Sequence, residues 1–388
     1  MALTLAACEA FAPDLPAQSE IQQAETDVVD PSRIIVLVNS VDASSNLTDK
    51  ALRRGYTLRE KHFLSGLDLV MLDFTIPNGL NGAASIRELE SLQPGATAGL
   101  DHRYGVQPQS AETPTGFAPV SAIQNYANMM IGWPAAGCAA HTRVGMIDGR
   151  IDRDLLSNID AQIITADFTG GAQAEASDHG SAIAALLVGS GRLSQATLYA
   201  AAVVDSSRQG GPVASVASII LALDWLRRSE VGVVNVSLAG PYNKLLDRAV
   251  TQSVRSGMVL VAAVGNDGAA ATPRYPAAFD DVIAVTAIDR DSKVYENAVR
   301  GDHVDVAAPG VDVFINDLSG GRFMTGTSIA APFVTSRIAA DPTLSKMTSA
   351  ASVVGALRTS AIDLGPKGPD DTFGAGLIKI NGPICQPH

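Results

Sequence analysis

The hydrophobic pattern is strongest after residue 142, where five continuously apolar runs alternate with helical segments. The runs are "TRVGMIDGR" (142–150), "TLYAAAVV" (197–204), "VGVVNVSLAG" (231–240), "GMVLVAAVGN" (257–266) and "VIAVTAID" (282–289). Helices are predicted from "VASVASIILALDWLRRS" (213–229) and "LLDRAVTQSVRSG" (245–257), the second with Gly257 as its C-cap. Strands that are apolar on both faces and alternate with helices indicate an α/β domain, with a parallel sheet covered on both sides.

The first hundred residues have a weaker and more mixed pattern. "RIIVLVN" (33–39) and "LDLVMLDFTIP" (67–77) are typical of strands, "DKALRRGYTLREK" (49–61) has mixed helical character, and "GAASIRELESL" (82–92) predicts a short helix. These segments form a compact β-α-β-α unit. Polar, Pro-containing residues precede it, and a Pro-, Gly- and Ser-rich stretch follows it to about Thr115. We therefore predict a signal remnant and linker at 1–30, a small α+β domain at 31–115 and a larger domain at 116–388.

Composition narrows the class of protein. The 388 residues are 46% apolar and 18% charged, which is typical of a globular chain. The formal charge of −12 argues against a nucleic-acid partner, because such binding depends on Lys and Arg neutralising phosphates. No stretch approaches the ~18 to 20 apolar residues of a transmembrane helix.

The three cysteines are Cys8, Cys138 and Cys385, and none lies in a C-x-x-C pair that would indicate zinc or iron–sulfur binding. Cys8 ends "LTLAAC", which resembles a bacterial lipobox whose cysteine is lipidated after cleavage, but a basic n-region and a full apolar h-region are missing. The alternative is a chance cysteine in an unstructured N-terminus. If Cys8 is lipidated, the other two remain as an even pair, and a disulfide between them would suit an oxidising envelope compartment.

Polar residues follow the buried strands, at the edge where ligands bind in parallel sheets. Asp148 ends the first run, Ser237 to Gly240 follow the third, and Asn266 follows the fourth. Each alone is ordinary loop chemistry. The stretch "GTSIAAP" (326–332) adds Ser328 at the start of a predicted helix, where a serine can act as an N-cap or as a nucleophile, and the two interpretations need not conflict.

A nucleophilic serine needs a base, and histidine is the usual one. Of the six histidines, His179 alone opens a helix of small apolar residues, "DHGSAIAALLVG" (178–189). A capping or packed histidine is the alternative for this residue taken alone. Considered with Asp148 and Ser328, it becomes a candidate general base.

Together these blocks resemble the subtilisin-like serine peptidases, or subtilases, over roughly residues 120–380. The chain order Asp, His, Ser is that of the family. Residues 33–115 resemble, by pattern, the ferredoxin-like inhibitory propeptide of the same family. The resemblance implies an α/β three-layer sandwich with a central parallel sheet, preceded by a small α+β propeptide domain.

Residue by residue, the resemblance implies that Ser328 is the nucleophile and His179 the general base and acid, and that Asp148 holds the imidazole tautomer. Asn266 would donate to the oxyanion. Substrate backbone would bind between "SLAG" and the "SSRQGGP" stretch (206–212). The substrate-binding residues implied are Ser237, Leu238, Ala239, Gly240, Gly210 and Gly211.

The implied protein is a secreted or lipid-anchored endopeptidase of the bacterial envelope, with broad specificity, made as a self-processed zymogen. Its partners are polypeptide substrates and its own propeptide. Catalysis needs no cofactor or metal. Structural calcium cannot be assigned, since the acidic clusters "FDD" (279–281) and "PDD" (369–371) are interpreted as solvated loops.

Three positions depart from the family pattern. Arg150 follows the Asp148–Gly149 turn, Ala182 replaces a second histidine, and Phe333 replaces a histidine after the helix proline. None of the replaced groups performs the bond-making step, so we expect activity. A non-catalytic relative that binds peptides is the main alternative. An α/β-hydrolase esterase fits poorly, because no G-x-S-x-G occurs.

Overall fold

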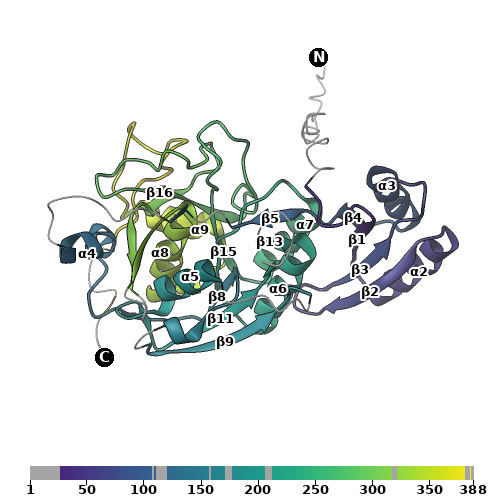
Figure 1. Ribbon diagram of the computed structural model, residues 1–388, viewed down its shortest axis with the longest axis horizontal. Coiled ribbons are helices and arrows are strands. Elements are labelled where there is room, and N and C mark those ends of the chain that lie inside the picture. The colour runs from purple at the N-terminus through teal and green to yellow at the C-terminus, as the bar shows by residue number, and fades with distance from the viewer. Residues whose placement is uncertain are drawn as a thin grey trace, which may run out of the picture.

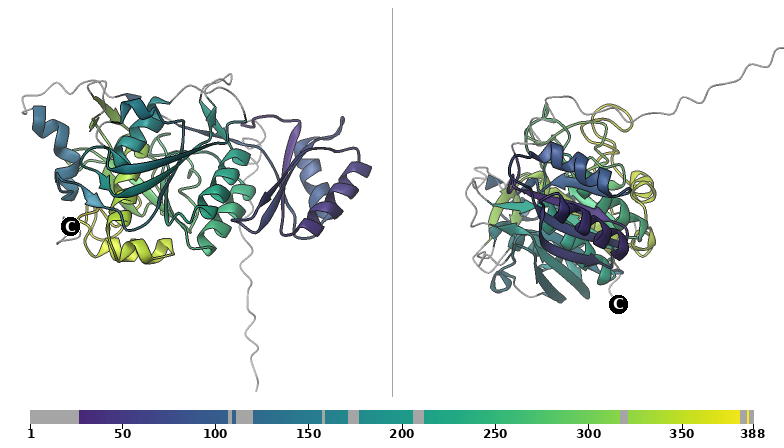
Figure 2. Two further views of the ribbon diagram at one scale, coloured as in Figure 1. Left: turned by 90° about the horizontal axis from the view of Figure 1, so that it is seen from below. Right: turned by 90° about the vertical axis from the view of Figure 1, so that its right-hand side faces the viewer.

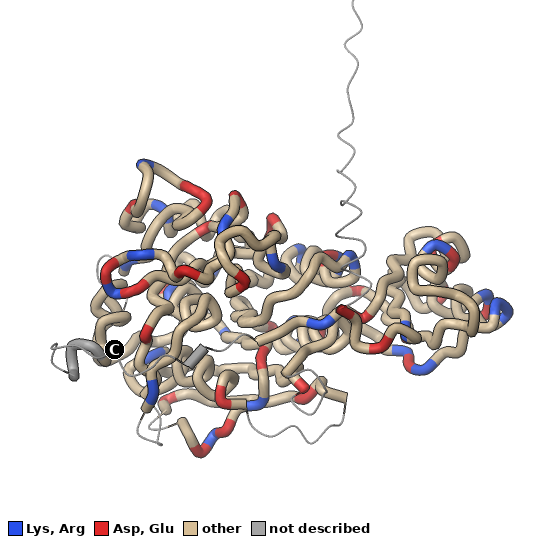
Figure 3. Tube along the Cα trace, turned by 45° about the horizontal axis from the view of Figure 1, so that its top comes forward, with Lys and Arg blue, Asp and Glu red and all other residues tan. Residues whose placement is uncertain are grey.

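The computed structural model describes residues 27–106, 109–110, 120–156, 159–170, 177–205, 212–316, 321–380 and 385. Cys8, Gly210 and Gly211 lie outside these ranges, so the predictions for them stay untested. Within the described part of the chain, a large α/β body and a smaller body lie end to end (Figure 1, Figure 2). Acidic and basic residues are interspersed along the trace of both bodies (Figure 3).

A seven-stranded sheet forms the centre of the large body, and every neighbouring pair in it is parallel. In spatial order its strands are β17 (Val306–Pro309), β16 (Val282–Ile288), β15 (Val259–Ala263), β14 (Val233–Val236), β8 (Val144–Asp148), β11 (Ala196–Ala202) and β9 (Ala161–Asp167). All five predicted strands are confirmed. Their continuous apolar runs are explained by burial on both faces.

Helices cover both faces of this sheet, which confirms the predicted α/β three-layer architecture. The helices α5 (Asp178–Val188) and α8 (Thr327–Ala340) pack on one face, and α6 (Val216–Arg228) and α7 (Lys244–Arg255) pack on the other. All 14 residues of α8 are buried. The helix α7 ends before Gly257, whose φ of 96° is the left-handed conformation of a glycine C-cap.

The smaller body is a four-stranded antiparallel sheet with two helices on one face. Its elements are β1 (Arg33–Val38), α2 (Val41–Arg53), β2 (Thr57–Leu64), β3 (Leu69–Thr75), α3 (Gly82–Leu92) and β4 (Thr97–Leu100), with strand order β2-β3-β1-β4. Ile34 and Val36 pack under α2 and α3, whereas Ile35 and Leu37 point the other way and belong to the core of the large body. The strand β1 is therefore buried on both faces.

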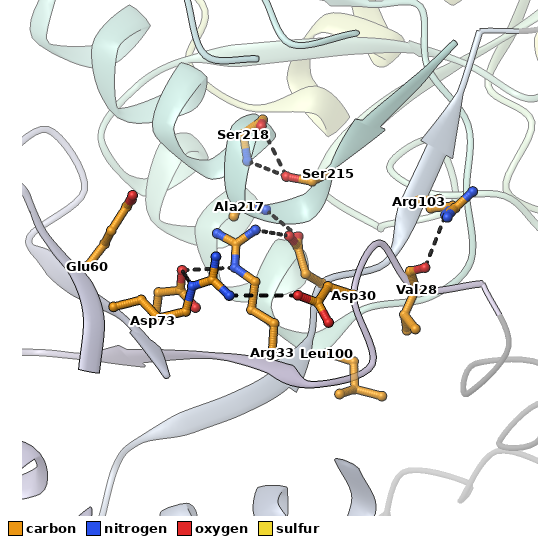
Figure 4. Close-up of polar contacts among 12 residues, drawn as sticks. Val28, Asp30, Arg33, Glu60, Asp73, Leu100, Arg103, Ser215, Ala217 and Ser218 are labelled. Atoms are coloured by element: carbon orange, nitrogen blue, oxygen red, sulfur yellow. Dashed lines mark hydrogen bonds and ion pairs between the residues drawn. The ribbon is translucent and has the colours of Figure 1, made fainter. Parts of the chain in front are cut away.

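The open face of this small sheet lies against α6 and α7 (Figure 2). Asp101 is fully buried at the junction, and its Oδ1 accepts the backbone N–H of Ala217 at 3.0 Å, in the first turn of α6. Arg33 bridges Asp101 at 3.0 Å and Asp73 at 2.8 Å. Figure 4 labels Arg33, Asp73 and Ala217 of this junction. A carboxylate at a helix N-terminus is favoured by the unpaired N–H groups and the helix dipole, so this contact ties the two bodies together.

Two segments differ from the prediction. The helical interpretation of 49–61 is wrong past Arg53: Gly55 has a φ of 91°, which ends the helix, and Thr57 starts a strand. Residues Val213–Ser215 form a strand rather than the first turn of α6, because they pair with residues 103–105, more than a hundred positions earlier in the chain.

The remaining elements are short or lie outside the main sheet. They are β5 (Arg103–Gly105), β6 (Gln109–Ser110), α4 (Val120–Ile131), β7 (Cys138–Ala139), η1 (Arg153–Leu155), β10 (Leu193–Ser194), β12 (Val204–Asp205), β13 (Val213–Ser215), β18 (Val313–Ile315), β19 (Arg322–Thr325), η2 (Leu344–Lys346) and α9 (Ala350–Arg358). A disulfide joins Cys138 to Cys385, with Cα atoms 4.8 Å apart.

Candidate active site

Three element ends bring Asp148, His179 and Ser328 together at the carboxyl edge of the large sheet. Asp148 is the last residue of β8, and His179 and Ser328 are the second residues of α5 and α8. His179 Nδ1 lies 2.9 Å from Asp148 Oδ1, and His179 Nε2 lies 3.0 Å from Ser328 Oγ. All three residues are at most 4% exposed. The imidazole thus bridges a carboxylate and a hydroxyl, so it can accept the hydroxyl proton.

Small residues allow α5 to approach the end of β8. A Cβ on Gly180 would lie 2.5 Å from the Gly149 carbonyl oxygen, and a Cβ on Gly149 would lie 2.4 Å from Cβ of Ser177. The Ser177 side chain accepts the N–H of Gly180 and so caps the helix. Both glycines are therefore required for His179 to reach Asp148.

The two carboxylate oxygens of Asp148 differ in their hydrogen bonds. Its Oδ1 accepts from His179 and, at 2.6 Å, from the N–H of Gly149. Its Oδ2 is buried without a hydrogen-bond partner among the described residues. A carboxylate at this position accepts a hydrogen bond from Nδ1–H, which orients the imidazole with Nε2 toward Ser328.

The interpretation of Ser328 as an N-cap is wrong. Gly326 caps α8 without a side-chain bond, with a φ of 155° that favours glycine, and Ser328 lies inside the first turn. Pro332 is four residues further on and has no N–H to offer the Ser328 carbonyl. Ser237 Oγ donates to that carbonyl instead, at 3.1 Å. The position of Ser328 is therefore supported by a side chain from the segment that directly follows β14.

Asn266 is half-buried beside Ser328, and its amide oxygen is held by Thr327. The N–H and the hydroxyl of Thr327 donate to Asn266 Oδ1 at 3.0 and 2.8 Å, and the Gly265 N–H donates to Thr327 Oγ1 at 3.2 Å. Since the amide oxygen is engaged, the amide N–H₂ is directed away from Thr327. The sequence analysis did not single out Thr327, although it directly precedes the candidate nucleophile.

The strand β5 lies between Ala239 and β13. Gly105 and Ala239 exchange two backbone hydrogen bonds of 3.0 and 3.1 Å, and β5 also pairs with β13 on its other side. Tyr104 is fully buried there, its hydroxyl donates to the Pro241 carbonyl at 2.5 Å, and burial raises the pKa of that hydroxyl well above its usual range. A Cβ on Gly240 would lie 2.6 Å from the Tyr104 ring.

These contacts divide the predicted substrate-binding residues into those that touch β5 and those that do not. Ala239 and Gly240 lie against β5, whereas Leu238 is buried and the Ser237 hydroxyl is bonded to α8. The opposite edge of the groove is formed by β13, which begins two residues after Gly211. That strand is a site element the sequence analysis missed, since it was taken as part of a helix.

This combination of a parallel-sheet sandwich and a Ser–His–Asp cluster defines an α/β serine peptidase. The profile of the subtilase family matches residues 42–376, and the chain belongs to that family. It is therefore one of the subtilisin-like serine endopeptidases by family.

Individual relatives agree with this assignment. Subtilisin DY of Bacillus licheniformis is 33% identical over 258 residues, which are 62% of this chain and 90% of that protein. The minor extracellular protease Epr of Bacillus subtilis (strain 168) is 30% identical over 189 residues, 48% of this chain and 28% of that protein. The crystal structure of fervidolysin from Fervidobacterium pennivorans, a keratinolytic enzyme related to subtilisin, superposes with a TM-score of 0.70 at 18% identity. That superposition covers 91% of this chain and 61% of the fervidolysin chain, and it supports the fold.

Within the described ranges, no group of three or more His, Cys, Asp or Glu side chains is arranged to hold a metal ion. None of the helices in the same ranges has the length and apolar character needed to cross a membrane.

Proposed function

We propose that this chain is an endopeptidase that cleaves peptide bonds through an acyl-enzyme on Ser328. The observation behind the proposal is the position of His179, within 3.0 Å of both Asp148 and Ser328. Ser328 Oγ attacks the peptide carbonyl while its proton passes to His179 Nε2. Protonated His179 then donates that proton to the leaving amine, and water releases the acyl group by the reverse sequence.

Charge on the oxyanion is stabilised by neighbouring donors. The amide of Asn266, oriented by Thr327, and the Ser328 backbone N–H are the proposed pair. The N-terminus of α8 contributes the positive end of its dipole. Removing one such side-chain donor typically costs roughly 3 to 4 kcal/mol of transition-state stabilisation.

We further propose that the chain is a zymogen whose N-terminal domain occupies its own substrate groove. The supporting contacts are β5 bound between β13 and Ala239, and β6 paired with β19, which leads directly to Ser328. Only a few residues separate β5 from β6 along the chain. Self-cleavage is therefore expected at a bond between Val106 and Ser110.

Backbone pairing on both sides of β5 is sequence-tolerant, because main-chain groups supply the hydrogen bonds. This favours a broad range of unfolded polypeptide substrates. The Cys138–Cys385 disulfide suits an oxidising compartment, so a secreted or envelope location is proposed, as the name of the extracellular protease Epr also suggests.

The test is active-site labelling of the full chain with a fluorophosphonate, followed by mass spectrometry of the modified residue and of the new N-terminus. We expect label on Ser328 and an N-terminus at one of residues 107–110. Ser328→Ala should stay unlabelled and unprocessed, whereas Ser352→Ala, a matched change of an exposed serine on α9, should behave as wild type. Normal maturation of Ser328→Ala would contradict self-cleavage, and a folded, processed chain without label would favour a non-catalytic peptide binder.

A further inference from the structure

Arg192 is a buried cation without an acidic partner in the described part of the chain. Arg192 is 6% exposed, and its guanidinium forms no ion pair among the described residues. Burial lowers the pKa of Arg192 to about 9, which leaves the group charged at neutral pH. A buried charge is costly unless it is paired, so an uncompensated guanidinium in a protein interior requires an explanation.

Neutral groups satisfy only part of this guanidinium. Nε donates to the Leu186 carbonyl at 2.5 Å, Nη1 donates to Asn128 Oδ1 at 2.6 Å, and Nη2 lies 3.5 Å from Ser336 Oγ. The first contact caps the C-terminal turn of α5, which is a structural role. Three of the five N–H groups are thereby used, and none of these acceptors neutralises the charge.

Two aromatic rings lie against the guanidinium of Arg192. The Arg192 Cζ lies 4.7 Å from the ring centroid of Trp133 and 4.6 Å from that of Phe333. Such stacking orients the planar group and restricts a ligand to its plane. A carboxylate is planar and can accept two parallel N–H bonds in that plane.

Arg192 also lines a cavity of about 420 Å³, a volume typical of small-ligand sites. The cavity lies between α4, β18, the C-terminal part of α5 and the middle of α8. Its polar lining is neutral, with Gln124, Asn125, Asn128, Ser190 and Asn316, and its apolar lining includes Phe314 and Phe333. Among the described lining residues none is acidic and Arg192 is the only basic one, so the charge matches a monoanion with an apolar body.

The cavity is separate from the substrate groove. Leu186 follows His179 by seven residues and Phe333 follows Ser328 by five, which places the cavity roughly 10 Å along α5 and roughly 8 Å along α8 from the candidate triad. We propose that this cavity is a binding site for a small monocarboxylate with an apolar or aromatic body, held by Arg192. The site is independent of peptide hydrolysis and of the peptide groove.

The experiment uses the full chain with Ser328→Ala, in which residues 103–105 fill the groove and self-cleavage is blocked. Phenylacetate and its neutral analogue phenylacetamide are titrated by calorimetry in a buffer free of other carboxylates. We expect phenylacetate to bind one-to-one with a Kd of about 1 mM or tighter, and the amide to bind roughly 10- to 100-fold more weakly, since only the acid makes charge-assisted bonds.

Variants then locate the site. Arg192→Met should lose the preference for the acid, and Arg192→Lys, which keeps the charge but not the planar fork, should weaken binding of the acid. Arg143→Met, a matched change at an exposed arginine paired with Glu230, should leave binding unchanged. If Arg192→Met fails to fold, the comparison of acid with amide on the otherwise unaltered chain still decides the question.

Three results would overturn the proposal. The first is equal affinity for the acid and the amide. The second is full retention of phenylacetate affinity in folded Arg192→Met. The third is the absence of any binding of phenylacetate up to about 10 mM, which would leave Arg192 with a structural role only.

Discussion

Replacing Tyr104 by alanine tests how the N-terminal domain is held in the groove. The ring is fully buried against Gly240, and its hydroxyl donates to the Pro241 carbonyl. An aromatic side chain buries about 150 to 250 Å², which at about 25 cal/mol per Å² gives an upper limit of roughly 4 to 6 kcal/mol. Because part of the ring would stay covered in the released propeptide, we expect a loss of about 3 kcal/mol, or about 150-fold in inhibition constant.

The assay measures peptidase activity of the self-cleaved complex over a dilution series, from which the inhibition constant of the propeptide follows. Tyr104→Phe is the matched control and should cost only about 1 kcal/mol, the value of one hydrogen bond. Gly240→Ala should weaken inhibition from the enzyme side, since its Cβ would lie 2.6 Å from the ring. An inhibition constant for Tyr104→Ala close to that of wild type would refute the assignment of β5 to the groove.

The other predictions concern catalysis and stability. Asn266→Ala should lower kcat roughly 10²- to 10³-fold with little change in KM, and steady-state kinetics with an unchanged kcat would contradict its oxyanion role. Burial raises the pKa of Asp305 to about 6, above the value of 3.8 for an unperturbed carboxyl, so the folded state binds this proton more tightly and stability falls as pH rises from about 4 to about 6. The pKa shift of Asp305 corresponds to about 3 kcal/mol. Urea unfolding of Asp305→Asn in the Ser328→Ala background should therefore show a gain in stability that grows as pH rises from about 4 to about 6. A gain that does not vary with pH would argue against the raised pKa. The Cys138–Cys385 disulfide spans 247 residues, so its reduction should cost about 5 kcal/mol of stability in the chain-entropy treatment and lower Tm. An unchanged Tm in dithiothreitol would show that the disulfide does not contribute to stability.

The strands of the large sheet were predictable because burial on both faces leaves an unbroken apolar run. The strand β9 was missed because it is an edge strand, and of its seven residues only Ile163 is buried. Residues Val213–Ser215 could not be assigned from local pattern, since their strand exists only through pairing with β5, more than a hundred residues earlier. Likewise, β2 follows a turn at Gly55 inside a segment with mixed helical character.

The candidate triad could be named from sequence because each member follows a recognisable local pattern. The supporting contacts could not, because they join residues far apart in the chain: Ser237 to the Ser328 carbonyl, and Thr327 to Asn266. Nothing in the stretch "GSGRLSQ" distinguishes Arg192 from an exposed arginine. Its burial follows from Trp133 and Phe333, which reach it from different elements.

The complete burial of α8 links activity to the state of the whole molecule. Ser328 is aligned with His179 only when this central helix is packed against α5 and the sheet. A newly made or damaged molecule would therefore lack peptidase activity until its interior is assembled. Peptidase activity, which is potentially harmful, is thus restricted to correctly folded molecules.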